Sequence, residues 1–313
     1  MGEANVNRRI FLKSAILSLA MGGACGKVYG SAAGGARFPI SMNSGTLKHY
    51  ALPVDEQICL CAEAGYDGVE LWMPDIVKYI DGGGTCGKIR GLLDSCGLKL
   101  YNILGFALWC HDDPKVAADG FAQIKREILV ARDLKCGYLA ATGYGMEKLT
   151  PEKLEWCKMR YRELLDFAAP HGVVPLLELW GHRAWHRLDD VASIAIGAGR
   201  PNANLLLDFY HLYRGGNSFD SLNQINCAAL PVFHINDYPA VPEYYKLTDA
   251  DRVFPGDGIC DFQKILPQLY ANGFRGALSV ELFNKGYWSK YSPSELLKVC
   301  RQKTESVIKK SFA

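Results

Sequence analysis

The stretch VVPLLELW, residues 173–180, is an apolar run interrupted by a single carboxylate, Glu178. Three later stretches repeat this pattern: ANLLLDFYH at 203–211, VFHINDY at 232–238 and ALSVELFN at 277–284. Each has the length of a buried strand and carries an acid or imidazole among its apolar residues, namely Asp208, His234 and Glu281. Because a charge buried among apolar residues is costly unless it is paired or binds a metal, these four residues predict a shared site.

Strand-like runs recur along the chain from residue 38 onward, with helix-like stretches between them. The predicted strands cover residues 38–44, 68–72, 98–106, 137–142, 173–180, 204–210, 232–237 and 277–283. Helices are predicted at 55–64, 113–134 and 261–271, and Thr150-Pro151 and Ser292-Pro293 are typical helix starts. Eight such units in a chain of 313 residues predict a single (β/α)8 TIM barrel of the α/β class. A doubly wound open sheet is the alternative, but no GxGxxG follows the first strand.

In a closed parallel barrel, the carboxyl ends of all strands meet at one mouth. The four residues would then converge there, and three carboxylates with one imidazole form a ligand set for a hard or borderline divalent cation. A buried salt-bridge network is the alternative, although these strand runs contain no Lys or Arg. The long stretch 238–260 after the seventh strand is rich in Pro, Tyr and Asp, and such loops are usually functional.

The first 36 residues have the features of an export signal. The stretch NRRIFLK at 7–13 closely resembles the twin-arginine motif, and the apolar run at 15–24 is too short to span a bilayer. We therefore predict a twin-arginine signal peptide and linker at 1–36, a barrel at 37–313, and a periplasmic or otherwise exported location. Cleavage before Cys25 would leave that cysteine for a lipid anchor, and cleavage within 31–36 is the alternative.

Composition argues against several other classes of protein. The formal net charge of +2 gives no support to a nucleic-acid partner. The 11 cysteines include no CxxC pair, and most of them lie in apolar contexts. We therefore expect buried free thiols rather than a zinc finger or a disulfide framework.

The motifs together resemble those of the xylose-isomerase-like TIM barrel superfamily over roughly residues 37–312. Within this sugar phosphate isomerase/epimerase family, the chain is similar to ketose 3-epimerases, inosose dehydratases and hydroxypyruvate isomerases. The resemblance is carried by ELW at Glu178, LDFYH at Asp208 and His211, FHINDY at His234, RVFPGDG from Arg252, and SVELF at Glu281. It implies one divalent metal ion, Mn2+ first with Mg2+, Co2+ or Zn2+ as alternatives, bound by Glu178, Asp208, His234 and Glu281.

The resemblance also implies an activity. Glu178 and Glu281 would be the catalytic acid/base pair, and His211 and Arg252 would bind substrate. The implied enzyme is a sugar isomerase or epimerase that removes a proton next to a carbonyl and passes through a metal-stabilised enediolate. A lyase or dehydratase that acts on a keto sugar or 3-keto-glycoside with the same metal and glutamates is the alternative.

Three weaker predictions come from position in the chain. Trp109 and His111 follow the third strand and are expected to line the mouth, where an aromatic beside a polar group suits a sugar. His182 lies beyond Glu178 and is expected to contact substrate. Glu70 and Trp72 end the second strand and are expected to shape the pocket.

Two other functions are disfavoured. An apurinic-site endonuclease of a related barrel family uses three zinc ions and needs more histidines, yet residues 236–260 contain none. A non-catalytic carbohydrate-binding relative would not require two opposed glutamates. The expected partner is therefore a small carbohydrate. The sequence leaves the oligomeric state open, with a homo-oligomer as one alternative, since members of the family that the chain resembles are often dimers or tetramers.

Overall fold

Eight parallel strands close into a barrel in chain order, in the part of the chain that the computed structural model describes, residues 38–313. The strands are β1 (Ile40–Asn43), β2 (Gly68–Trp72), β3 (Lys99–Leu104), β4 (Tyr138–Thr142), β5 (Val174–Glu178), β6 (Asn204–Asp208), β7 (Val232–Ile235) and β8 (Ala277–Val280). β8 pairs with β1, with Ser41 opposite Ser279, so the sheet has no free edge. The predicted TIM barrel is confirmed, whereas the predicted signal peptide at 1–36, with Cys25, lies outside the described residues.

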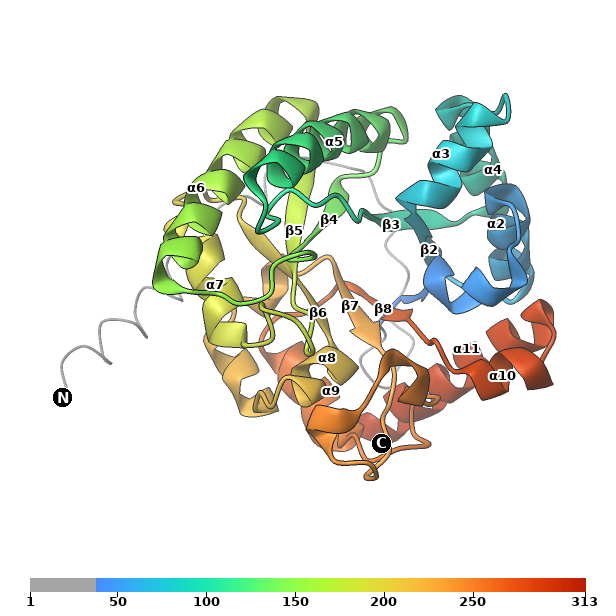
Figure 1. The fold of residues 1–313 in the computed structure, drawn as a ribbon. Coiled ribbons are helices and arrows are strands. Elements are labelled where there is room, and N and C mark those ends of the chain that lie inside the picture. Colours follow the sequence, from blue (N-terminus) through green and yellow to red (C-terminus); the bar gives the residue numbers. More distant parts are fainter. Residues whose placement is uncertain (1–37) are drawn as a thin grey trace.

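Helices surround the strands on all sides (Figure 1). They are α2 (Val54–Glu63), α3 (Met73–Asp81), α4 (Cys86–Cys96), α5 (Pro114–Asp133), α6 (Pro151–Ala168), α7 (Leu188–Gly197), α8 (Phe209–Arg214), α9 (Phe262–Ala271), α10 (Lys285–Lys290) and α11 (Pro293–Ser311). Short 3-10 turns complete the connections: η1 (Ser44–Tyr50), η2 (Ala169–His171), η3 (Phe219–Gln224), η4 (Cys227–Ala229), η5 (Tyr244–Lys246) and η6 (Asp249–Asp251). In the described chain, no helix is both long and apolar enough to cross a bilayer.

The predicted helix starts have a clear physical basis. The Thr150 side chain accepts a hydrogen bond from the Lys153 amide, and Pro151 follows as the first helical residue of α6. Ser292 and Glu295 form a reciprocal capping box at α11. The ten cysteines of the described chain are all free thiols, as predicted, and six of them are buried.

Strand alternation separates two apolar layers. Leu177 and Leu207 point outward and pack in the core between sheet and helices. Leu176 and Leu206, one position earlier, point inward and pack with Leu104 inside the barrel. Residues two positions further along β5 and β6 face inward too, because side chains alternate in a strand. These are Glu178 and Asp208, the last residues of their strands.

Candidate metal centre and active site

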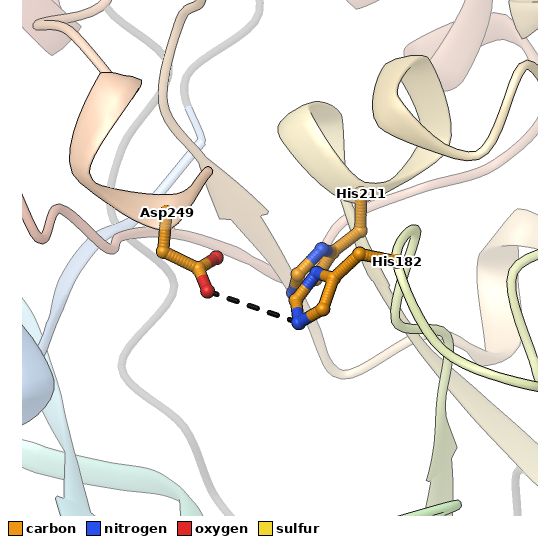
Figure 2. Close-up of side chains that lie close together, drawn as sticks. All are labelled: His182, His211 and Asp249. Atoms are coloured by element: carbon orange, nitrogen blue, oxygen red, sulfur yellow. Dashed lines mark ion pairs between the residues drawn. The ribbon is translucent and has the colours of Figure 1, made fainter. Parts of the chain in front are cut away.

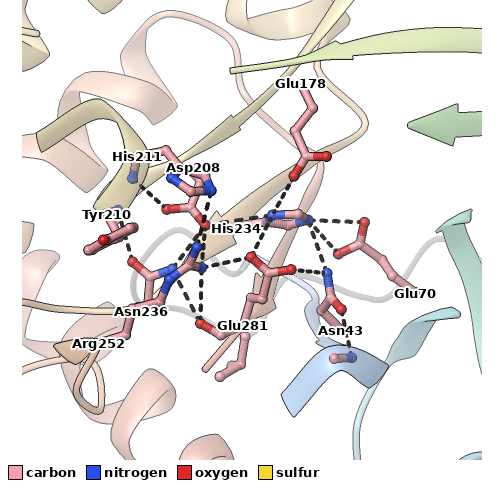
Figure 3. A network of polar contacts seen from close by, with 12 residues as sticks. Asn43, Glu70, Glu178, Asp208, Tyr210, His211, His234, Asn236, Arg252 and Glu281 are labelled. Carbon is pink, nitrogen blue, oxygen red and sulfur yellow. Dashed lines mark hydrogen bonds and ion pairs between the residues drawn. The ribbon is translucent and has the colours of Figure 1, made fainter. Parts of the chain in front are cut away.

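Three of the four predicted ligands converge at the barrel mouth. Asp208, His234 and Glu281 are buried, and each offers a ligand atom within 4.8 Å of the others. His234 Nδ1 lies 3.6 Å from Asp208 Oδ2 and 3.4 Å from Glu281 Oε2. The fourth residue, Glu178, places Oε1 at 3.9 Å from the same nitrogen. Figure 3 shows Glu178 and Glu281 reaching toward the His234 ring from different sides.

Asp208, His234 and Glu281 form the part of this set that fits a single divalent cation as it stands. Two ligand atoms that each lie about 2.1 Å from one ion can be at most about 4.2 Å apart, and His234 Nδ1 meets this limit toward Asp208, Glu281 and Glu178, at 3.6, 3.4 and 3.9 Å. Glu178 does not belong to the group whose ligand atoms all lie within 4.8 Å of one another, so its side chain would have to approach to complete the set. His234 Nδ1 and Glu178 Oε2 are buried without a hydrogen-bond partner. Since buried polar atoms normally have partners, these two atoms are free to serve as ligands.

Two asparagines orient the carboxylates. Asn43, at the end of β1, donates to Glu281 Oε1 at 2.8 Å. Asn236, two residues after His234, donates to Asp208 Oδ2 at 2.9 Å. Such outer contacts fix ligand orientation and contribute to metal affinity.

Arg252 reaches this cluster from the loop between β7 and α9. Its side chain is 1% exposed, and Nη1 donates to Asp208 Oδ2 at 3.1 Å and to Glu281 Oε2 at 2.7 Å. Nη2 donates to Asp249 Oδ1 at 2.7 Å. The guanidinium therefore partly neutralises the carboxylates, and it binds the same two oxygens, Asp208 Oδ2 and Glu281 Oε2, that lie near His234 Nδ1.

Asp237 holds the loop that carries Arg252. Its Oδ2 accepts hydrogen bonds from the Gly256 and Gly258 amides at 3.0 and 2.9 Å. Its Oδ1 accepts from the amides of Tyr238 and Cys260 at 2.8 and 3.0 Å. One buried carboxylate thus satisfies four backbone amides and ties the end of β7 to residues 256–260, which fixes the loop that carries Arg252.

The two glutamates have opposite protonation tendencies. Burial raises the pKa of Glu178 to about 8, the negative charge of Glu281 adds to the shift, and His234 opposes it. Burial also raises the pKa of Glu281, but His234 and Arg252 outweigh it and bring the value to about 2. Burial would lower the pKa of His234, yet the Glu70 and Glu281 carboxylates raise it well above its usual value. Without a cation, the cluster therefore holds protons that a bound metal would displace.

His211 is brought to the site by a helix. Asp208 Oδ1 caps α8 by accepting from the His211 amide at 2.9 Å, and His211 follows one turn later on the same side. The histidine therefore reaches the site from the first turn of α8 rather than from a loop. Arg252 Nη2 lies 3.1 Å from His211 Nε2 and can only donate, so that nitrogen is the acceptor. Burial and the charge of Arg252 lower the pKa of His211 well below its usual value, which keeps the ring neutral.

His182, predicted to contact substrate, lies at the edge of the same cluster. Its Nε2 is 3.9 Å from Asp249 Oδ2, and its ring is 5.5 Å from that of His211 (Figure 2). His182, His211 and Asp249 have ligand atoms close enough for a second ion. However, Arg252 donates to both His211 and Asp249, and its charge opposes another cation there. We therefore interpret this trio as polar groups beside the site.

Two predicted substrate contacts do not reach the site. The Trp109 indole has 0% exposure and packs against Tyr161 and Trp185 in the layer between sheet and helices, so it cannot line the mouth. His111 is half-buried, and its Nδ1 accepts from the Asp113 amide at 2.9 Å. It organises the loop before α5, and the structure does not bring it to the carboxylates.

Glu70 contributes more than the sequence indicated. It is fully buried on β2, and its Oε2 lies 3.0 Å from His234 Nε2, the nitrogen on the far side from the predicted ligands (Figure 3). The signal was present, because Glu70 and Glu178 occupy the same tripeptide Glu-Leu-Trp at the ends of β2 and β5. Asn43 and Asn236 gave no comparable signal.

A sequence model described as the Xylose isomerase-like TIM barrel matches residues 58–303. The chain belongs to this family. An inosose isomerase of Bacillus velezensis is 28% identical over 257 residues, which cover 81% of this chain and 91% of that protein. The crystal structure of the IOLI protein with a bound zinc atom has a TM-score of 0.80 at 25% identity, covering 88% of this chain and 100% of that one. A 3-dehydroshikimate dehydratase of Pseudomonas aeruginosa is 25% identical over 74% of this chain and 36% of that protein.

Proposed function

We propose that this protein is a divalent-metal-dependent isomerase or epimerase of a keto sugar or keto cyclitol. The observation that carries the proposal is the buried pair Glu178 and Glu281, which meet at one His234 nitrogen together with Asp208. The similarity to inosose isomerase supports a cyclic polyol ketone as the substrate class. The zinc-containing relative supports a divalent ion, and we propose manganese, with magnesium, cobalt or zinc as alternatives.

The two glutamates supply the proton transfers. A divalent ion at this site would provide a Lewis acid for the substrate carbonyl. Glu281, whose pKa is held at about 2, is ionised at neutral pH and accepts the proton from the carbon next to the carbonyl. Glu178, which a bound cation would ionise, takes up a proton from a substrate hydroxyl or from water and delivers it from its own side of the substrate. Delivery to the same carbon gives epimerisation, and delivery to the neighbouring carbon gives isomerisation.

Arg252 and His211 orient the substrate in this scheme. Both are buried beside Asp208, so they can bind an oxygen with little competition from water. Arg252 offers N–H donors. His211 is neutral, and its Nδ1 is buried without a partner, so it can bind a substrate hydroxyl. His182 would meet a more distant hydroxyl group.

A second candidate function, elimination from a keto sugar or 3-keto-glycoside, is favoured by two observations. A relative is a dehydratase. In addition, Trp72 at the end of β2 packs with Phe106 and Phe283, at ring distances of 4.7 and 6.1 Å, and all three are half-buried. Such a surface suits an apolar ring carried by the substrate. The glutamate would remove the proton next to the carbonyl, a double bond would form, and the substituent one carbon further would leave with its electrons and take up a proton.

Export through the twin-arginine pathway, into the periplasm or onto a lipid anchor at Cys25, is a further proposal based on the sequence of residues 1–36. A homo-oligomer is a separate proposal, which rests on the resemblance to this family. Fractionation of cells that express the wild-type chain and an Arg8→Lys/Arg9→Lys variant tests export. Equal amounts outside the cytoplasm would contradict it.

Turnover of candidate ketoses and inososes in deuterium oxide distinguishes the two reactions. Incorporation of one solvent deuterium with no loss of a substituent identifies isomerisation or epimerisation. Release of water or an aglycone identifies elimination. Absence of both, with Mn2+, Mg2+, Co2+ or Zn2+ supplied, would contradict the proposed function.

A further inference from the structure

Glu70 is a carboxylate that is sealed inside the barrel against the ring of His234. Its side chain is 0% exposed. Its two oxygens, Oε1 and Oε2, lie 3.3 and 3.0 Å from His234 Nε2. Within residues 38–313, no Lys or Arg forms an ion pair with it. Oε1 already accepts a hydrogen bond from Asn102, and accepting a second one from the His234 ring places a hydrogen on Nε2.

Neighbouring amides fix the direction of this contact. Asn102, on β3, donates to Glu70 Oε1 at 2.9 Å and holds the carboxylate in place. Asn43 Nδ2 also lies near His234 Nε2, at 3.4 Å, but it donates to Glu281 at the shorter distance of 2.8 Å. The Asn43 oxygen accepts from the Gly45 amide and the Trp72 indole, which fixes the amide orientation. Both Glu70 oxygens lie closer to Nε2 than Asn43 does, and the contact to Oε1 at 3.3 Å has the geometry of a hydrogen bond while Oε2 has no hydrogen-bond partner, so Nε2 donates to Glu70 Oε1.

Resting on the proposed metal-dependent function, we propose that Glu70 is a positioning residue that holds the Nε2–H form of His234 and directs the Nδ1 lone pair toward the cation. Nδ1 is the nitrogen that faces Asp208, Glu178 and Glu281. A carboxylate on the opposite nitrogen fixes the ring and makes the ligand more basic. β2 thus contributes to a centre whose ligands come from β5 to β8.

A merely structural role for Glu70 predicts a different response to substitution. If Glu70 only filled space in the barrel, Glu70→Gln would preserve shape and leave metal affinity unchanged. Under the proposal, Glu70→Gln removes the negative charge and faces the Gln amide against the Asn102 donor. Divalent metal affinity should fall about 10–100-fold, the range typical of lost outer-sphere partners.

The test compares Mn2+ affinity, measured by competition with a fluorescent chelator, in four full-length proteins. These are the wild type, Glu70→Gln, Glu70→Gln/Asn102→Asp, and the control Glu127→Gln. Glu127 is a buried carboxylate on α5 that accepts from Gln123 at 2.7 Å, away from the predicted ligands. The double variant restores a negative charge one hydrogen bond further out, so it should bind more tightly than Glu70→Gln. Equal affinity in Glu70→Gln and Glu127→Gln would overturn the proposal.

A second measurement keeps this inference separate from the metal itself. In the metal-free protein, 1H–15N correlation of the histidine rings should show a hydrogen on His234 Nε2 whose proton resonance moves in Glu70→Gln and stays in Glu127→Gln. If wild-type protein binds no divalent ion, the proposed function fails while this spectrum still decides the role of Glu70. An unprotonated Nε2, or a resonance that ignores Glu70→Gln, would overturn the inference.

Discussion

Replacing Arg252 with methionine should destabilise the metal-free protein strongly. The guanidinium is 1% exposed and pairs with Asp208, Glu281 and Asp249 at 3.1, 2.7 and 2.7 Å. Removing one partner from a buried ion pair typically costs about 3–5 kcal/mol, because the remaining charge stays buried and uncompensated. Methionine has a similar length, so little of this cost should come from a cavity.

This loss in the free energy of unfolding can be expressed as a decrease in melting temperature. At about 2–4 °C per kcal/mol, a loss of about 3–5 kcal/mol corresponds to a decrease of roughly 6–20 °C. The decrease should be smaller at pH 5 than at pH 8, because without Arg252 the pKa values of Asp208 and Glu281 rise and protonation relieves the repulsion. Saturating Mn2+ should stabilise the variant at least as much as the wild type, since a cation replaces the lost charge.

Differential scanning calorimetry of chelator-treated protein measures this shift. The control is Arg132→Met, an exposed arginine on α5 that pairs with Asp133 at 2.8 Å and should cost no more than about 1 kcal/mol. A metal-free Arg252→Met protein that melts within about 2 °C of Arg132→Met would refute the view that Arg252 balances buried carboxylates.

Three further predictions concern the same site. Glu178→Gln should keep its melting temperature within a few degrees and lose about 100-fold or more in turnover, because it removes the acid/base group; full activity would contradict the assignment. Metal binding should release about two protons near pH 6.5, since burial raises the pKa of Glu178 to about 8 and nearby carboxylates outweigh burial to raise the pKa of His234. Apparent Mn2+ affinity should then rise about 100-fold per pH unit near pH 6.5. The metal-free fold should lose stability as pH rises from about 4.5 toward 8, because Glu178 and His234 keep protons in the folded state that the unfolded chain releases. Titration calorimetry of Mn2+ binding in two buffers that shows no proton release would exclude this linkage. Asp237→Asn should cost about 2–4 kcal/mol and lower turnover, because an amide NH2 would face backbone N–H donors of the loop that carries Arg252; unchanged stability by urea unfolding would argue against the loop-fixing role.

Strand periodicity was sufficient to predict the fold and the inward direction of two side chains at the barrel mouth. Glu178 and Asp208 end β5 and β6 as inward-facing residues, as the alternating leucines indicated. The predicted fifth and sixth strands continued two residues too far, because the residues after Glu178 and Asp208 remain apolar or aromatic although the chain leaves the sheet there.

The sequence was less informative wherever a loop decides the direction of a side chain. Trp109 follows β3 in a loop that carries the indole into the outer core, which no periodic pattern could indicate. His211 reaches the site because Asp208, which is also a predicted metal ligand, caps the short helix α8 that carries His211. The sequence did not indicate this second role of Asp208. Glu70 shared the Glu-Leu-Trp pattern of Glu178, but its partner His234 lies five strands further along the chain.

The most direct test of the metal centre is anomalous diffraction from crystals grown with Mn2+. We predict one strong peak within ligand distance of His234 Nδ1, surrounded by oxygens of Glu178, Asp208 and Glu281. No peak at that position, or a peak that instead lies among His182, His211 and Asp249, would contradict the account.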